Sequence, residues 1–142
     1  MSYGLAQARY AGDATETVSA GRLLTMLYDR LVGDLGAAED AMRAGDVASV
    51  GTRIGRAQEI LLELHSTLDT SAWAGGESLA QLYVWMVGEL MQARLRNQPQ
   101  RIADCRELLE PLREAWHTAA GAQARPDGGP AAAAGAAAFG VA

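Results

Sequence analysis

The sequence of 142 residues contains no lysine and one cysteine, and both scarcities narrow the choice of function. All 12 basic residues are arginine, and with 17 acidic residues the formal net charge is −5. Such a chain lacks the cationic surface that nucleic acids and anionic membranes require, so neither is an expected partner. The single thiol, Cys105, cannot form an internal disulfide, which is typical of a protein from a reducing compartment.

Long apolar runs are also missing. No stretch approaches the ~18 apolar residues of a membrane-spanning helix, so we expect no membrane insertion. Residues 1–4 are neither basic nor followed by the apolar core of a signal peptide. These observations predict a soluble, cytoplasmic protein.

No segment alternates apolar and polar residues as a half-buried β-strand does, whereas four segments have apolar residues at steps of three and four. The four stripes run from Leu24 to Met42, from Val47 to Leu68, from Leu79 to Arg94 and from Ile102 to Trp116. Helices of similar length with short connections favour an antiparallel bundle. We therefore predict an all-α fold, an up-down-up-down four-helix bundle.

Composition also divides the chain into three parts. Residues 1–18 are rich in glycine and threonine and are expected to form a flexible N-terminal arm, with Ser19 capping the first helix. Residues 19–120 form the predicted bundle. Residues 121–142 are mostly alanine, glycine and proline, a low-complexity composition that cannot bury enough apolar surface to fold, so we expect a disordered C-terminal tail.

Two of the predicted helices carry more apolar residues than a bundle core encloses, which is roughly three in every seven. The second helix has three in succession at residues 60–62, and the third has six at residues 82–87. Val84, Met91 and Leu95 form a second stripe beside the core stripe of the third helix. A broad core explains this excess, and so does a groove for another protein's helix or a dimer face. Composition alone leaves these interpretations equal.

The chain has no catalytic signature. It contains no glycine-rich phosphate loop, CxxC pair, HExxH or GxSxG motif, so we predict no enzyme activity, no cofactor and no metal site. His65 and Asp69 are two ligands where zinc takes three or four. Histidine phosphotransfer modules are also four-helix bundles, but the residues beside His65 include no cation that would steady a phosphoryl group. This alternative is therefore weak.

Six short segments follow one another at characteristic spacings. They are Leu23–Asp29 (LLTMLYD), Arg56–Leu64 (RAQEILLEL), Leu68-Asp69, Gly75-Gly76-Glu77, Leu82-Tyr83 and Leu112–Trp116 (LREAW), and Tyr10 precedes the first of them by 13 residues. In this order and spacing the chain resembles the flagellar secretion chaperone family FliS over residues 3–119. Ala20 and Arg30 depart from the family pattern, which often has proline and a small residue there, and the Ala/Gly tail is not a family feature.

This resemblance implies a helical chaperone that holds the disordered C-terminal segment of flagellin in the cytoplasm. It would prevent premature polymerisation and deliver flagellin to the flagellar type III export apparatus. Export-gate components and a competing regulator are further candidate partners, and the arm with Tyr10 would cover part of the groove. The alternative is a structural bundle whose second stripe forms a homodimer. The predicted partner-binding residues are Leu5, Tyr10, Ile60, Leu62, Leu64, Val84, Met91 and Leu95.

Overall fold

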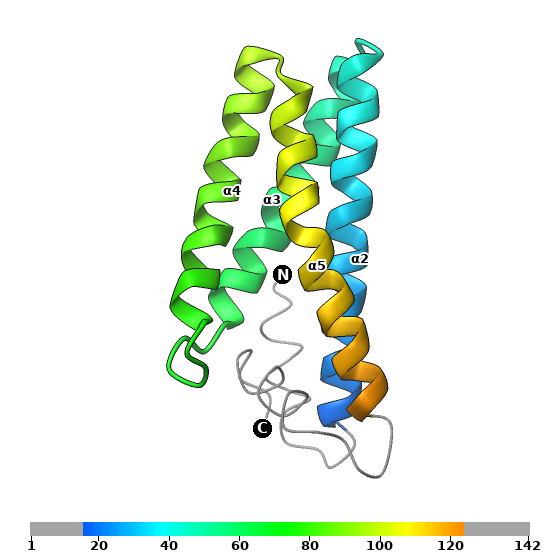
Figure 1. Ribbon diagram of the computed structural model, residues 1–142. Helices are drawn as coiled ribbons and strands as arrows, with labels where there is room; N and C mark the ends of the chain where they lie inside the picture. Colours follow the sequence, from blue (N-terminus) through cyan, green and yellow to red (C-terminus); the bar gives the residue numbers. More distant parts are fainter. Residues whose placement is uncertain (1–15, 124–142) are drawn as a thin grey trace.

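The computed structural model describes residues 16–123, which form four α-helices and no strand (Figure 1). The helices are α2 (Glu16–Arg43), α3 (Val47–Thr67), α4 (Gly76–Arg96) and α5 (Pro99–Gln123). Each helix packs against the next in sequence, and α5 packs against α2 to close the bundle. Figure 1 shows successive helices running in opposite directions. The predicted four-helix fold is confirmed.

The outer ends of the bundle differ from the prediction. Helix α2 begins at Glu16, so Ser19 lies inside the helix and is not its N-cap. Helix α5 continues to Gln123, beyond the predicted end at residue 120. Serine, threonine and valine each cost only some tenths of a kcal/mol inside a helix, so residues 16–19 do not stop it. The rest of the predicted arm and tail lies outside the described residues.

The connections between helices follow local turn chemistry. Asp46 is the N-cap of α3, and its carboxylate accepts a hydrogen bond from the Ser49 backbone N–H at 3.2 Å. Gly76 is the first residue of α4. A Cβ at Gly76 would lie 2.9 Å from the Cα of Thr70, so the close approach of this turn requires glycine.

The α4–α5 connection is shorter. Asn97 ends α4 in the left-handed conformation (φ 52°), where asparagine is among the few tolerated residues. Pro99 then starts α5, at a position where its missing N–H leaves no helical hydrogen bond unmade.

The core consists of the predicted apolar stripes without Val47 and Arg94, which are exposed, and it contains a pair of buried tyrosines. Tyr28 of α2 and Tyr83 of α4 are both fully buried, and their hydroxyl groups form a hydrogen bond to each other. Burial raises the pKa of Tyr28 to about 12, against the opposing effect of this hydrogen bond. The Trp116 ring of α5 lies beside Tyr28, with 6.2 Å between ring centroids. Cys105 is buried in the same cluster, as expected from its place on the α5 stripe.

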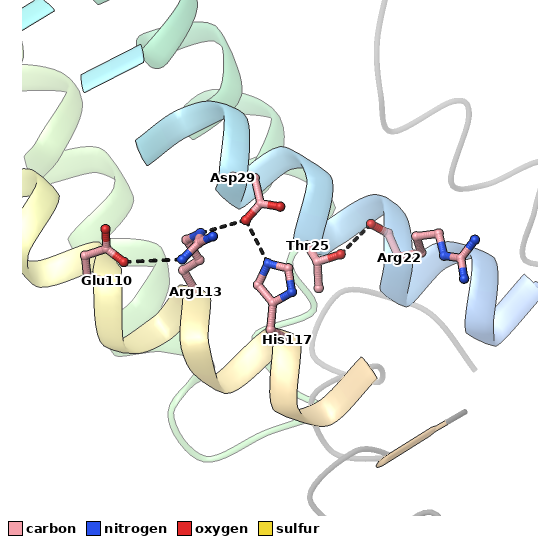
Figure 2. A network of polar contacts seen from close by, with 6 residues as sticks. All are labelled: Arg22, Thr25, Asp29, Glu110, Arg113 and His117. Atoms are coloured by element: carbon pink, nitrogen blue, oxygen red, sulfur yellow. Dashed lines mark hydrogen bonds and ion pairs between the residues drawn. The ribbon is translucent and has the colours of Figure 1, made fainter. Parts of the chain in front are cut away.

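Polar side chains join α2 to α5 at two levels. Figure 2 shows Arg113 and His117 of α5 pointing at the Asp29 carboxylate of α2, at 2.6 Å and 2.7 Å. Partial burial raises the pKa of Asp29, but the hydrogen bonds from His117 and Arg113 outweigh it, and the net pKa is lowered. Further along, Glu39 accepts from Arg106 at 2.8 Å. These contacts set the relative register of the two helices.

The other neighbouring pairs are joined in the same way. Asp34 of α2 pairs with Arg53 of α3 at 2.9 Å, and Glu89 of α4 pairs with Arg101 of α5 at 2.8 Å. Between α3 and α4, the side-chain amide of Gln58 donates to the Val87 carbonyl at 3.1 Å. Every adjacent pair of helices therefore has at least one directional contact in addition to apolar packing.

Candidate partner-binding surface

Helices α3 and α4 carry large apolar side chains on their outer surface. Leu62 and Val84 are each 54% exposed, Met91 is 52% exposed and Leu95 is 73% exposed. We call these four residues the α3–α4 face. Half-exposed residues of this size contribute little to the bundle's own core, so their apolar surface is available to a partner.

The spacing along α4 places its three members on one side. Val84, Met91 and Leu95 are separated by seven and four residues, so at 100° per residue they fall within a narrow sector of the helix. Gly88 lies in the same sector, and a Cβ there would meet nothing within 4 Å. The stripe is therefore interrupted by a small open gap between Val84 and Met91.

Leu62 of α3 joins this stripe across the helix pair. The hydrogen bond from Gln58 to the Val87 carbonyl fixes the register of the two antiparallel helices. Counting from it, Leu62 stands within one residue of the level of Val84. Nearby, an open depression of about 500 Å³ is lined by His65 and Thr70 on one side and by α4 on the other; the α4 residues lining it are Glu77, Ala80, Gln81, Val84 and Trp85. The apolar stripe therefore leads into a hollow near the α3–α4 turn.

Two of the predicted partner-binding residues are placed elsewhere. Ile60 is 3% exposed and Leu64 is fully buried, so in this bundle neither belongs to the exposed α3–α4 face. Ile60 and Leu62 are two residues apart, so their side chains are rotated by 200° about the helix axis and cannot share a face. Leu64 belongs to the core seam. We remove both from the surface, and Leu5 and Tyr10 lie outside the described residues.

Trp85 is an exposed apolar residue that the predicted set omitted. It is 47% exposed and lines the depression beside Val84. The signal was its place in the apolar run of residues 82–87, where successive side chains point in different directions. Tryptophan combines large apolar area with one polar N–H group, a combination enriched at protein interfaces.

The same region offers little for catalysis. His65 lies in the depression with an acidic residue, Glu77, and no arginine lines it. No group of three His, Cys, Asp or Glu side chains within residues 16–123 could hold a metal ion. None of the helices in that range has the length and apolar character required to cross a membrane. What the surface can do is bind apolar side chains.

Comparison with known proteins assigns the chain to a family. The model of the family described as flagellar protein FliS matches residues 2–123. The chain belongs to the FliS family. Its sequence is similar to the flagellar secretion chaperone FliS of Salmonella typhimurium, with 35% identity over 107 residues, covering 72% of this chain and 78% of the relative. The corresponding protein of Vibrio cholerae is 33% identical over 101 residues, covering 69% and 73%. That of Bacillus subtilis is 26% identical over 110 residues, covering 78% and 82%.

The matched region of the FliS family includes all four helices and hence the whole α3–α4 face. The resemblance found in the short sequence segments is thereby confirmed. The relatives are named as flagellar secretion chaperones. An exposed apolar face on an otherwise well-packed bundle is consistent with such a role.

Proposed function

We propose that this protein is a cytoplasmic chaperone that binds the disordered C-terminal segment of flagellin on the α3–α4 face. By covering that segment it prevents premature polymerisation, and it aids delivery of flagellin to the flagellar type III export apparatus. Membership of the FliS family supports the class of function. The observation that carries the binding site is the set of four half-exposed apolar side chains on two adjacent helices.

The chemistry of the face suits a segment that folds as it binds. A disordered segment loses conformational entropy on binding, so the apolar contact has to be extensive. The stripe on α4 provides apolar side chains at helical spacing, which is the arrangement that receives an amphipathic helix in a groove. Met91 within the stripe can adapt to side chains of different shape, and Trp85 beside it adds a large apolar area.

Calorimetric titration with a C-terminal flagellin segment of about 40 residues from the same organism tests the proposal. We expect saturable binding near one to one, with a negative heat-capacity change from apolar burial. No binding to the folded protein would refute the flagellin assignment. A mass that rises with protein concentration in size-exclusion chromatography would then indicate that the α3–α4 face joins two copies of the chain.

A pair of matched substitutions locates the site. Leu95→Gln removes an apolar contact from the face, and burying a leucine side chain is worth roughly 1.5–3 kcal/mol, so the affinity should fall at least tenfold. Leu108→Gln on α5 is the control, because Leu108 is also an exposed leucine (47%) but lies on another helix. If both variants bind as well as wild type, or if Leu108→Gln is the more damaging, the face has been misplaced.

A further inference from the structure

A polar pocket of about 410 Å³ lies between α2 and α3 and has no part in the α3–α4 face. It is lined by Arg30 and Asp34 of α2 and by Arg53, Arg56, Glu59 and Ile60 of α3. Three arginines face two carboxylates, so the pocket carries one net positive charge in a chain whose formal charge is −5. A local excess of guanidinium groups favours a ligand that bears an oxyanion.

Asp34 adds a second requirement. Its side chain is almost completely buried, and its Oδ1 atom accepts a hydrogen bond from Arg53 Nη1 at 2.9 Å. Its Oδ2 atom is also buried but has no hydrogen-bond partner among the described residues. A buried acceptor left without a donor costs about 1–3 kcal/mol, so an occupant that moves the side chains covering Oδ2 and brings a donor relieves that cost.

The two requirements together distinguish between sources of the oxyanion. A free carboxylate would satisfy the arginines but would bring no donor for Asp34 Oδ2, whereas inorganic phosphate carries a P–OH donor at neutral pH and has to be distinguished by its own titration. An acidic residue within a polypeptide satisfies both, because its carboxylate accepts from the guanidinium groups while a neighbouring backbone N–H is available to Asp34. Arg56 is exposed and forms no ion pair within residues 16–123, so its donors are available to such a ligand.

Helix α3 connects the pocket to the α3–α4 face. Arg56 and Leu62 are six residues apart, a rise of about 9 Å along the helix axis. Arg56 faces α2, whereas Leu62 lies one turn beyond Gln58, whose side chain contacts α4. A polypeptide that covers Leu62 and crosses α3 therefore reaches Arg56 within a few residues.

We propose that the α2–α3 pocket binds an acidic side chain of the same polypeptide that occupies the α3–α4 face. This inference rests on the proposed function and adds a charged contact to its apolar one. The partner is thus recognised at two points, and the charged point selects segments with a carboxylate at the correct distance from their apolar residues.

A double-mutant cycle with the flagellin segment tests the pocket. Each Glu or Asp of the segment is changed in turn to Gln or Asn, and each peptide is titrated against wild type and against Arg56→Gln. We expect Arg56→Gln to weaken wild-type segment binding about tenfold and one acidic position to lose its effect in that variant. Arg43→Gln is the matched control, since Arg43 is an exposed α2 arginine outside the pocket and pairs with Glu39 at 3.1 Å.

The outcomes separate the two proposals. If the segment does not bind wild type, both the proposed function and the pocket assignment are wrong. If it binds but no acidic position couples to Arg56, or if Arg43→Gln is equally damaging, only the pocket assignment is wrong. Saturable binding of inorganic phosphate that leaves the segment's affinity unchanged would assign the pocket to a free anion and would also overturn it. Circular dichroism of Arg56→Gln confirms that the variant is folded.

Discussion

The hydrogen-bonded tyrosine pair in the core makes a sharp prediction about stability. Tyr28 and Tyr83 are fully buried, and each hydroxyl is the partner of the other. Changing one tyrosine to phenylalanine therefore removes one hydroxyl and leaves the other buried without that partner. Stranding a buried polar group costs about 1–3 kcal/mol. We expect Tyr28→Phe and Tyr83→Phe each to lower the free energy of unfolding by about 2 kcal/mol.

The double variant should be more stable than either single variant. With both hydroxyl groups gone neither hydroxyl is stranded and the two rings keep their apolar packing, so the contact that remains lost is the hydrogen bond between Tyr28 and the Trp116 side chain. Replacing both partners of a buried hydrogen bond with apolar groups of similar shape is nearly neutral, so we expect it within about 1 kcal/mol of wild type. The coupling energy is then about 3 kcal/mol, the upper end of values for contacting residues.

Urea denaturation followed by circular dichroism at 222 nm measures all four proteins. For a domain of this size, 2 kcal/mol corresponds to a fall in Tm of roughly 8 °C, which thermal scans resolve easily. Additive losses, with the double variant less stable by about 4 kcal/mol, would show that the two hydroxyl groups do not depend on one another. That result would refute the reasoning from the buried pair.

Three further predictions concern local features. Gly33 lies inside α2, and a Cβ there meets nothing within 4 Å, so Gly33→Ala should raise the free energy of unfolding by about 0.5–1 kcal/mol. Gly76→Ala should lower it by about 1–3 kcal/mol because its Cβ would clash with the backbone of Thr70. Urea denaturation measures both changes. Glu39→Gln should cost about 1 kcal/mol at pH 7. The hydrogen bond from Arg106 lowers the pKa of Glu39 from 4.5. The stability difference between wild type and Glu39→Gln is therefore present above pH 4.5 and should vanish as the pH falls through the lowered pKa. An equal loss of stability at pH 7 and at pH 3 would contradict this prediction. Cys105 is fully buried, and burial raises the pKa of its thiol to about 12. Its reaction with a thiol reagent should therefore occur only as fast as the protein unfolds globally. Fast labelling of the native protein would show that the thiol is accessible.

The helices were predictable because their stripes are long and regular. The stripe residues between Leu24 and Met42 on α2 are buried as their spacing indicated, and so are those between Ile102 and Trp116 on α5 except Leu112, which is partly buried. The helix ends were less predictable. A serine such as Ser19 can cap a helix or lie inside one, and the residues before Ser19 can also be helical, so its presence does not fix where α2 begins. Asp46 succeeded as a cap because Gly45, with φ 76°, ends the preceding turn beside it.

The candidate surface was predictable only in part. On α4, the spacing of Val84, Met91 and Leu95 places them outside the core stripe whatever the neighbouring helices do. On α3, Ile60 and Leu62 flank the core residue Leu61 on opposite sides, and sequence alone does not say which side faces solvent. The structure decides this, because α2 covers Ile60 and leaves Leu62 exposed.

The polar pocket could not be predicted from the sequence. Arg30 and Asp34 come from one helix and Arg53 and Arg56 from another, and their meeting depends on the register of α2 against α3. Arginine on an amphipathic helix usually indicates a solvated face. Only the burial of Asp34, a tertiary property, distinguishes this cluster from ordinary surface charge.

The arrangement of α4 separates stability from binding along a single helix. Tyr83, Met86 and Leu90 are fully buried and hold α4 in the bundle, whereas Val84 and Leu95 are exposed and contribute little to folding. A partner that covers the exposed residues therefore gains apolar contact without competing with the core for the same side chains. Because the core side chains pack tightly and each helix pair has a directional contact, the face keeps its shape before the partner arrives. The entropy cost of binding then falls mainly on the partner's own segment, as expected for a chaperone whose client is disordered until it is bound.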